Sequence, residues 1–401
     1  MCAAASVWGN NLRLSIFGES HGPAVGLVLD GLPAGEPIDN DALLLQMSRR
    51  APGRDKSSTP RKEADTPRIL SGLLDGVTTG APLCILIENT NTRSKDYGSL
   101  KRIPRPGHSD YAAYLKYAGY NDIRGGGHFS GRLTACLCAA GAVCRQILSR
   151  RGIRIAGHVA SIGPVRDSLF PETDIPIELM ERLSSVYFPV IDTEKENAMR
   201  DVIEEARMSL DSVGGVVECA VTGMPGGLGG PLFGGVESLL SSILFGIPAV
   251  KGVEFGSGFG AAQKRGSENN DPYRYVDGSV KIVKNSAGGI LGGITTGAPI
   301  LFRIALKPTS SIAREQESVD LTAGENTLLS VHGRHDPCVV PRAVPVAESA
   351  AAVAMLELLL SAPPECLRPR PAESVKPAKS TAASEKTAEQ HEPAVREEVS
   401  L

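Results

Sequence analysis

Two segments of this chain each occur twice, in the same order. Residues 22–35, GPAVGLVLDGLPAG, are similar to residues 214–227, GGVVECAVTGMPGG, with a Gly-Leu/Met-Pro-x-Gly turn at the same place. Residues 72–90, GLLDGVTTGAPLCILIENT, are similar to residues 289–309, GILGGITTGAPILFRIALKPT. Chance similarity of Gly-rich segments explains one pair more easily than two ordered pairs. The sequence therefore predicts a diverged duplication, with two half-molecules related by a pseudo-twofold axis.

The hydrophobic patterns indicate strands joined by turns, together with long helices. Strands are predicted at residues 25–30, 83–88, 216–222 and 300–306. Helices are predicted at residues 133–150, 194–211 and 343–360. The last helix is nearly all apolar and must be buried. Because no regular βαβ alternation appears, we expect an α+β fold of antiparallel sheets packed on a helical layer.

The chain divides into one long folded region and a tail. We expect the folded region at residues 1–362, with repeat halves at roughly 1–190 and 191–362. Residues 363–401 are rich in Pro, Ala, Glu, Lys and Ser and have almost no large apolar residues. Such a segment cannot bury enough surface to offset its ordering entropy, so we predict a disordered low-complexity tail.

The composition excludes several classes of protein. Aromatic residues make up only 4% of the chain, which argues against platforms that stack single-stranded nucleic acid. The net charge of −3 gives no basic field to attract DNA or a membrane. No apolar stretch reaches about 18 residues, so no membrane span is expected. The eight cysteines lack metal-finger spacing, and residues 1–10 do not resemble a signal peptide. We expect a cytoplasmic protein with reduced core thiols.

Three segments combine histidine with glycine or proline. His21 lies in FGESHG, where glycines allow the backbone to approach a ligand closely. His108 lies in RPGHSDY between Arg105 and Asp110, a carboxylate that could orient its imidazole. Asp336 lies in the third segment, HGRHDP. Histidine transfers protons readily near neutral pH, so these segments are candidates for acid–base catalysis.

Other segments are suited to anions. RGGGHFSGR, residues 124–132, precedes a predicted helix, and consecutive glycine N–H groups at a helix start favour a phosphate. KPTSS, residues 307–311, supplies one ammonium and three hydroxyls. Residues 48–62 form a dense basic loop that either is a solvated surface or covers a polyanionic ligand.

The residues alone indicate an enzyme that handles a phosphate-bearing small molecule with histidine acid–base chemistry. Two alternatives stay open at this point. The first is a metal-dependent phosphohydrolase that uses His332, His335 and Asp336. The second is a non-catalytic flavoprotein or scaffold that uses the tail as an interaction element.

The chain resembles the chorismate synthase family from about residue 6 to residue 360. The motifs that carry the resemblance are GESHGPAVGLVLDGLPAG, RPGHSDY, KGVEFGSGF, AGGILGGI, ALKPTSSI and GRHDPCVVPRAVPVAE, which follow one another in the family's order. The resemblance implies a β-α-β sandwich, in which long central helices lie between antiparallel sheets, and a homotetramer. It also implies an anti-1,4-elimination of phosphate from 5-enolpyruvylshikimate 3-phosphate that yields chorismate, the seventh step of the shikimate pathway. Reduced FMN is the implied cofactor, supplied by a separate flavin reductant.

The matching motifs imply a role for individual residues. His21 resembles the general acid for the leaving phosphate, and His108 the histidine that protonates or stabilises reduced flavin near N1. Asp336 resembles the aspartate that works with flavin N5 to take the C6 proton. The implied FMN contacts are His128, Phe129, Ser130, Pro248, Ala249, Gly292, Lys307, Pro308, Thr309, Ser310, Ser311 and Arg334. Arg49, Arg50 and Lys56 resemble contacts to substrate phosphate or NADPH, and whether NADPH binds is left open.

The chain departs from the family at two of these places. The family often has GGRSSARET where this chain has GGHFSGRLT, so that His128, Phe129 and Leu133 replace Arg, Ser and Glu. We therefore expect a weaker or shifted flavin contact there. Ala51 and Lys56 stand where arginines are common, which weakens the NADPH assignment.

Overall fold

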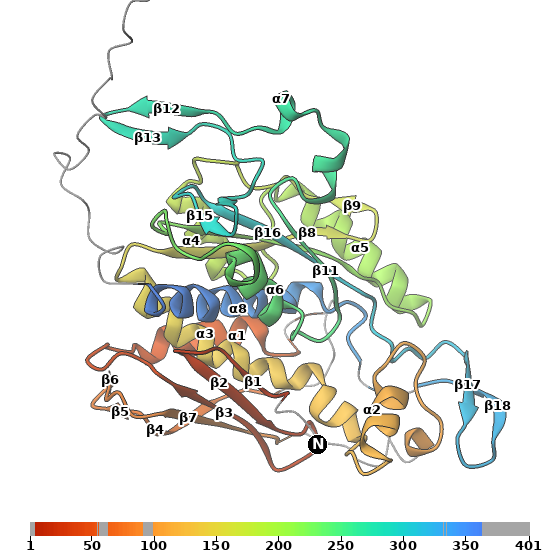
Figure 1. The fold of residues 1–401 in the computed structure, drawn as a ribbon. Coiled ribbons are helices and arrows are strands. Elements are labelled where there is room, and N and C mark those ends of the chain that lie inside the picture. Colours follow the sequence, from red (N-terminus) through yellow and green to blue (C-terminus); the bar gives the residue numbers. More distant parts are fainter. Residues whose placement is uncertain are drawn as a thin grey trace, which may run out of the picture.

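The fold is that of a computed structural model, which describes residues 5–53, 55, 63–90, 99–331, 333 and 335–362. The predicted tail lies outside these residues. Two five-stranded sheets, in which all neighbouring strands are antiparallel, form the outer layers (Figure 1). The first sheet has the strand order β1 (Val7–Trp8), β2 (Arg13–Gly18), β3 (Ala24–Asp30), β7 (Leu83–Glu88), β4 (Pro67–Ser71). The second has the order β9 (Val165–Arg166), β8 (Arg154–Ile162), β10 (Gly215–Thr222), β16 (Ile300–Leu306), β11 (Val250–Phe255).

Three helices lie between the two sheets: α1 (Asn40–Arg50), α3 (Thr134–Ser149) and α8 (Val340–Leu360) (Figure 1). The helix α3 approaches α8 closely because Gly141 has no side chain. A Cβ at Gly141 would lie 2.2 Å from the Cβ of Ser349. The predicted sandwich of central helices between antiparallel sheets is confirmed.

The helix α8 has the hydropathy of a membrane span but is buried in this core. Among the described helices it is long and apolar enough to cross a membrane, with a mean hydropathy of 1.7, yet 94% of that apolar window is buried. The sequence interpretation found no such stretch because Glu348 and Glu357 interrupt it. Burial between two sheets explains the apolar composition.

Shorter elements surround these layers. The remaining helices are α2 (Asp110–Tyr117), α4 (Ile177–Ser185), α5 (Glu194–Met208), α6 (Val236–Leu244) and α7 (Gly266–Asn269). Four hairpins are formed by β5 (Leu73–Leu74) and β6 (Val77–Thr78), β12 (Tyr273–Val276) and β13 (Ser279–Ile282), β14 (Ile290–Leu291) and β15 (Ile294–Thr295), and β17 (Gln316–Asp320) and β18 (Glu325–Leu329). The 3-10 turns used below are η3 (Arg124–Phe129), η4 (Gly131–Leu133) and η5 (Leu232–Gly234).

The two sheets have equivalent strands in the same order, as expected for a duplicated sequence. Strands β2, β3, β7 and β4 correspond to β8, β10, β16 and β11. The β5–β6 hairpin corresponds to β14–β15, and the helices α1 and α3 correspond to α6 and α8. The second repeat therefore begins at β8, directly after α3, and not near residue 190 as predicted. The sequence interpretation placed the division too late because it did not recognise β8 as a strand.

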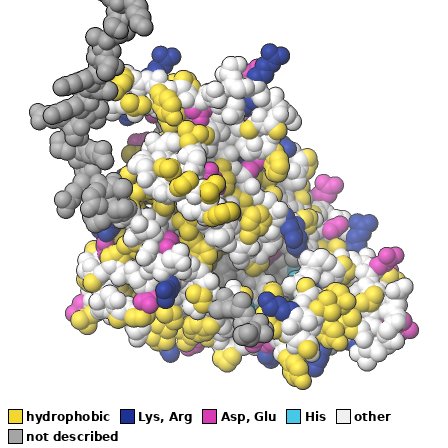
Figure 2. Space-filling model, in the orientation of Figure 1, with side chains coloured by type: hydrophobic (Ala, Val, Ile, Leu, Met, Phe, Trp, Pro, Cys, Tyr) yellow, Lys and Arg dark blue, Asp and Glu magenta, His cyan; other side chains and the backbone are white. Residues whose placement is uncertain are grey.

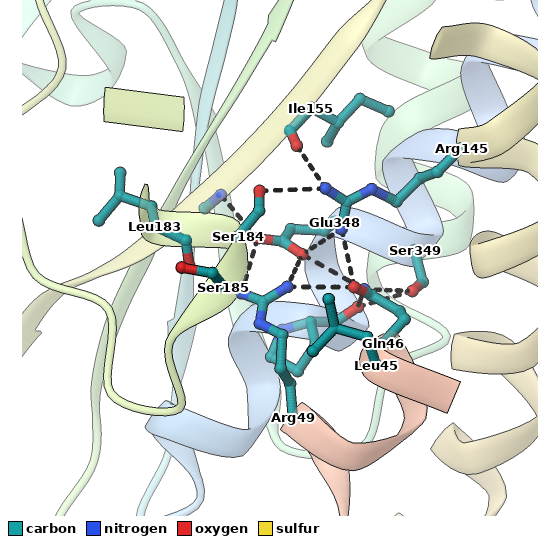
Figure 3. Close-up of polar contacts among 12 residues, drawn as sticks. Leu45, Gln46, Arg49, Arg145, Ile155, Leu183, Ser184, Ser185, Glu348 and Ser349 are labelled. Atoms are coloured by element: carbon teal, nitrogen blue, oxygen red, sulfur yellow. Dashed lines mark hydrogen bonds and ion pairs between the residues drawn. The ribbon is translucent and has the colours of Figure 1, made fainter. Parts of the chain in front are cut away.

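A buried polar cluster joins the central helices to the second sheet (Figure 3). Glu348 of α8 is fully buried, and its carboxylate accepts hydrogen bonds from Arg49 Nη1 and Nη2 of α1, at 2.5 and 3.0 Å. It also accepts from Arg145 Nη1 of α3 at 2.7 Å and from the backbone N–H of Gly157 in β8 at 2.9 Å. Because these donors satisfy both oxygens, the cluster fixes the register of α1, α3 and α8 against β8.

Candidate active site

The triglycine segment of η3 lies between His21 and His108. Gly125, Gly126 and Gly127 all have positive φ, which favours glycine. A Cβ at Gly125 would lie 2.2 Å from His21 Nδ1, and a Cβ at Gly126 would lie 3.3 Å from His108 Nε2. Two imidazoles that come from distant parts of the sequence therefore contact neighbouring residues of one loop.

His21 is held by the turn that follows β2. It is buried, with 8% of its surface exposed. The backbone N–H of Ser20 donates to the carbonyl of Gly127 at 3.1 Å, which ties this turn to the triglycine segment. Asn89, directly after β7, donates from Nδ2 to the carbonyls of Glu19 and Gly22, each at 2.9 Å. These contacts fix the backbone on both sides of His21.

His108 lies just before α2, beside two groups of opposite charge. Its Nδ1 lies 2.5 Å from Asp110 Oδ1, and Arg105 bonds the same carboxylate through Nε and Nη2. The pKa of His108 is lowered, because burial and the nearby Arg105 and Lys307 charges outweigh the raising effect of Asp110. His108 is therefore a neutral imidazole at neutral pH.

The KPTSS segment adjoins the His108 loop. Lys307 Nζ donates to Ser310 Oγ at 2.8 Å, and Ser310 Oγ donates to the carbonyl of Gly107 at 2.9 Å. Arg105 Nη1 donates to Ser311 Oγ at 3.0 Å. Burial and the charges of Lys251 and Arg105 lower the pKa of Lys307, which indicates a concentration of positive charge. Among the described residues, none bonds the buried Oγ1 of Thr309.

Asp336 reaches the same region from the loop before α8. Arg342 Nη1 donates to its Oδ2 at 2.5 Å, and Arg342 Nε donates to the carbonyl of Arg50 at 3.0 Å. Residues 212 and 213 connect this loop to KPTSS. Ser212 Oγ donates to the carbonyl of Thr309 at 2.7 Å, and the N–H of Val213 donates to the carbonyl of Pro337 at 2.9 Å. Arg334 lies outside the described residues.

The chain that brings together these two histidines, the aspartate and the cationic, hydroxyl-rich segment is similar to proteins of a known family. A family model described as chorismate synthase matches residues 12–360. The chain belongs to the chorismate synthase family. It is therefore an enzyme, a carbon–oxygen lyase acting on phosphates, in the biosynthesis of aromatic amino acids. The family match ends just before the predicted tail.

Curated relatives and a solved structure agree with this assignment. The chorismate synthase of Korarchaeum cryptofilum is 48% identical over 345 residues, which cover 86% of this chain and 94% of that protein. The chorismate synthase of Methanosarcina acetivorans is 46% identical over 357 residues, which cover 89% and 96%. A solved structure titled "Crystal Structure of Chorismate Synthase" matches with a TM-score of 0.69 and 28% identity, over 88% of this chain and 93% of that one.

Two predicted ligand arginines are buried and have partners within the protein. Arg49 is 2% exposed, and Glu348 binds its guanidinium. Arg50 is 3% exposed, and it donates to Asp65 Oδ2 at 2.5 Å and to the carbonyl of Gly131 at 2.9 Å. That they also contact a substrate or NADPH phosphate stays a prediction. Lys56 lies outside the described residues.

His128, Phe129 and Ser130, in the segment where this chain departs from the chorismate synthase family, contact other parts of the protein. His128 bonds the carbonyl of Gly18 through Nδ1 at 2.8 Å and Ser6 Oγ through Nε2 at 2.7 Å. Phe129 is 37% exposed and lies beside Tyr117. Ser130 caps η4 by accepting from the N–H of Arg132. Both nitrogens of His128 thus have protein partners.

The remaining predicted FMN contacts divide into two groups. Pro248 and Ala249 directly precede β11, and the Ala249 carbonyl accepts from the N–H of Lys307 at 3.0 Å. Gly292, however, lies in the turn of the β14–β15 hairpin, which precedes β16, whereas Lys307 follows β16. A strand of this length separates the two by roughly 20 Å. Within one chain Gly292 therefore lies apart from the other predicted contacts.

Sequence reasoning did not single out Asn89, Asp65 and Arg132, whose side chains bond one another beside the site. Arg132 donates from Nε to Asn89 Oδ1 at 2.9 Å and bonds the Asp65 carboxylate through Nη1. The duplication could have pointed to Asn89. Asn89 and Lys307 each directly follow one of the two equivalent strands, β7 and β16, and Lys307 was already a candidate site residue.

Proposed function

We propose that this chain eliminates phosphate from 5-enolpyruvylshikimate 3-phosphate to form chorismate, with reduced FMN as its cofactor. The observation that supports this most is the pair of imidazoles at the triglycine segment, next to the cationic KPTSS segment. The site offers proton donors and acceptors on one side and anion-binding groups on the other, which an elimination of phosphate needs.

The residues present are suited to a phosphorylated flavin. Thr309 has a buried hydroxyl oxygen without a partner in the described part of the chain, and a bound ligand would satisfy it. Lys307 and Ser310 lie beside it and would hold an anionic group. When bound, reduced FMN supplies transient electron donation that helps the allylic phosphate to leave.

The protein's own groups would manage the protons. His21, whose turn is fixed by Asn89 and by the triglycine segment, would give a proton to the departing phosphate. Asp336, oriented by Arg342, would act on the C6 proton of the substrate. His108, which is neutral at neutral pH, would hold or accept a proton beside the cofactor. Each of these groups comes from a different loop, and the packing of the two repeats brings the loops together.

We further propose that the chain works as a homotetramer. Leu232 and Phe233 of η5 are 83% and 95% exposed. Leu291 and Ile294 of the adjoining β14–β15 hairpin are also exposed, and Figure 2 shows hydrophobic side chains gathered on this face, over α6 and that hairpin. Apolar side chains so exposed are typical of an interface between subunits. A separate reductant for FMN and a cytoplasmic location stay predictions.

An anaerobic assay tests the proposed reaction. The purified chain, with the substrate and FMN kept reduced, is expected to release phosphate and to form chorismate, and to do neither when FMN is omitted or oxidised. His21→Ala and Asp336→Asn are expected to lose most turnover and to retain FMN binding, measured by equilibrium dialysis. Phosphate release that is independent of flavin and sensitive to a chelator would instead support the phosphohydrolase alternative.

A further inference from the structure

The His108 imidazole shares its Nδ1 side with a strongly held carboxylate. Asp110 Oδ1 lies 2.5 Å from Nδ1, a contact shorter than an ordinary N–H···O hydrogen bond. Asp110 is 7% exposed and begins the first turn of α2, where the helix dipole favours an anion. A carboxylate in this position accepts a hydrogen bond and does not donate one.

Arg105 keeps Asp110 charged and fixed in place. Its Nε and backbone N–H donate to Oδ2, at 2.7 and 3.1 Å, and its Nη2 donates to Oδ1 at 2.8 Å. Although burial works to raise it, the pKa of Asp110 is well below its usual range, because the bonds from Arg105 and His108 outweigh burial. Ser311 accepts the remaining Nη1 bond at 3.0 Å, so the guanidinium has a fixed orientation.

The proton on the ring can then be assigned. Because Asp110 is an anion that only accepts, Nδ1 carries the proton. Arg105 Nη2 and Ser109 Oγ also lie 3.1 and 3.4 Å from Nδ1. However, a lone pair on an unprotonated Nδ1 would face the anionic Oδ1 at 2.5 Å and be repelled by it. A second proton on the ring is opposed by burial and by the charges of Arg105 and Lys307. Among the described residues, none bonds Nε2, which faces Gly126.

We propose that Asp110 is a positioning residue that holds His108 as the tautomer protonated on Nδ1, so that the unprotonated Nε2 faces the triglycine segment. His108 thereby acts as an acceptor on the side where His21 also lies. The importance of this tautomer for turnover rests on the proposed function. The assignment of the proton itself rests only on the contacts of Arg105, His108 and Asp110.

Nitrogen NMR on the full chain labelled with 15N-histidine tests the assignment without any ligand. His108→Gln identifies the His108 signals. In the wild type, Nδ1 is expected to have the chemical shift of a protonated ring nitrogen and Nε2 that of an unprotonated one. The opposite pattern in the wild type would overturn the proposal, and this measurement needs no destabilised variant.

Asp110→Asn tests the role of the carboxylate. Its amide can turn to donate to Nδ1 while Arg105 bonds the amide oxygen, so the ring proton is expected to move to Nε2. We expect kcat to fall about 10²- to 10⁴-fold with little change in KM, as for the loss of an oriented acid–base group. Asp110→Glu is expected to restore the Nδ1 tautomer and part of the kcat.

Asp320→Asn is the matched control. Asp320 is also buried and bonds an arginine, Arg102, at 2.7 Å, but no imidazole is part of that pair. It is expected to leave both the His108 spectrum and kcat unchanged. An unchanged tautomer in a folded Asp110→Asn variant would refute the positioning role. If the tautomer changes as expected but the wild type does not catalyse the elimination, only the proposed function fails.

Discussion

Gly125 lies so close to His21 that a Cβ at this glycine would be 2.2 Å from the imidazole Nδ1. No side chain is tolerated at that distance, and the backbone φ of +60° disfavours one as well. The glycine is therefore part of the wall against which the His21 ring lies, and it limits where the ring can be.

Gly125→Ala is expected to abolish most turnover because the methyl group must displace the His21 ring. Gly152→Ala is the matched control, since Gly152 also has a positive φ, of +77°, but nothing lies within 4 Å of its Cβ position. Both variants should lose about 1–2 kcal/mol of stability through backbone strain. Only Gly125→Ala should lower kcat, by about 10²-fold or more, as when a catalytic group is misplaced. Equal kcat in the two variants would show that the close approach of Gly125 to His21 is not needed for turnover.

The fully buried His158 predicts a pH dependence of stability. It bonds Asp167 through Nδ1 and Glu218 through Nε2, each at 3.0 Å. Burial alone would lower its pKa, but these two carboxylates raise it above its ordinary value of 6.5. The stabilisation is therefore fully present below about pH 6.5 and is lost as the pH rises through the raised folded-state pKa.

The measurement is the free energy of unfolding of the wild type minus that of His158→Gln, from pH 6 to pH 9. The difference should fall with rising pH, with a slope of at most about 1.4 kcal/mol per pH unit. Because other titrating groups are common to both proteins, their effects cancel. A difference that stays constant over this range would mean that the imidazole is not charged in the folded state.

Arg49→Met tests whether Arg49 is structural or binds substrate. Its loss leaves Glu348 with one fewer cation in a fully buried site, so we expect a loss of about 3–5 kcal/mol of stability. The KM of the enzyme that remains folded should not change. Arg68→Met is the control, because Arg68 and Glu88 form an exposed pair at 3.7 Å that should contribute less than about 1 kcal/mol. A rise in KM without loss of stability would restore the substrate role of Arg49.

Thr309→Val tests the unpartnered hydroxyl. Removing it should leave the apo protein equally or slightly more stable, because a buried polar oxygen without a partner is destabilising. The Kd for FMN, measured by fluorescence titration, should rise roughly tenfold, which is the loss of one hydrogen bond. In contrast, Thr78→Val should destabilise the apo protein, since Thr78 Oγ1 donates to the carbonyl of Pro33 and accepts from the N–H of Glu36. Unchanged FMN affinity in Thr309→Val would exclude the hydroxyl as a ligand contact.

Much of the fold could be predicted because the periodicity of apolar residues along the chain indicates its strands and helices. The repeated segments became β3, β7, β10 and β16, and the apolar run near the end became α8, since strand and helix periodicities reflect burial directly. Strand β8 was missed. Polar His158 and the flexible Gly157 interrupt its apolar pattern, and their partners, Glu218 and Glu348, are distant in sequence.

The site was predicted only in part, because local motifs can be recognised in a sequence but distant partners cannot. Glycine and histidine motifs marked His21 and His108, whose local sequences supply part of their own support. Arg49 and Arg50 looked like ligand groups because they stand in a basic run. Their partners, Glu348 and Asp65, are brought to them only by the tertiary fold, and a charge pattern along the chain does not report on burial.

The position of α8 in the chain has a consequence for how the protein folds. It follows every other helix and strand of the described chain, yet it packs against α1 and α3 and against β8 and β10 of the second sheet. A growing chain that emerges from the ribosome would therefore expose the inner face of the second sheet until this last helix is synthesised. Topologies dominated by such distant contacts fold slowly and expose apolar surface on the way. The cell's need to shield that intermediate is thus set by the order in which the polypeptide is made.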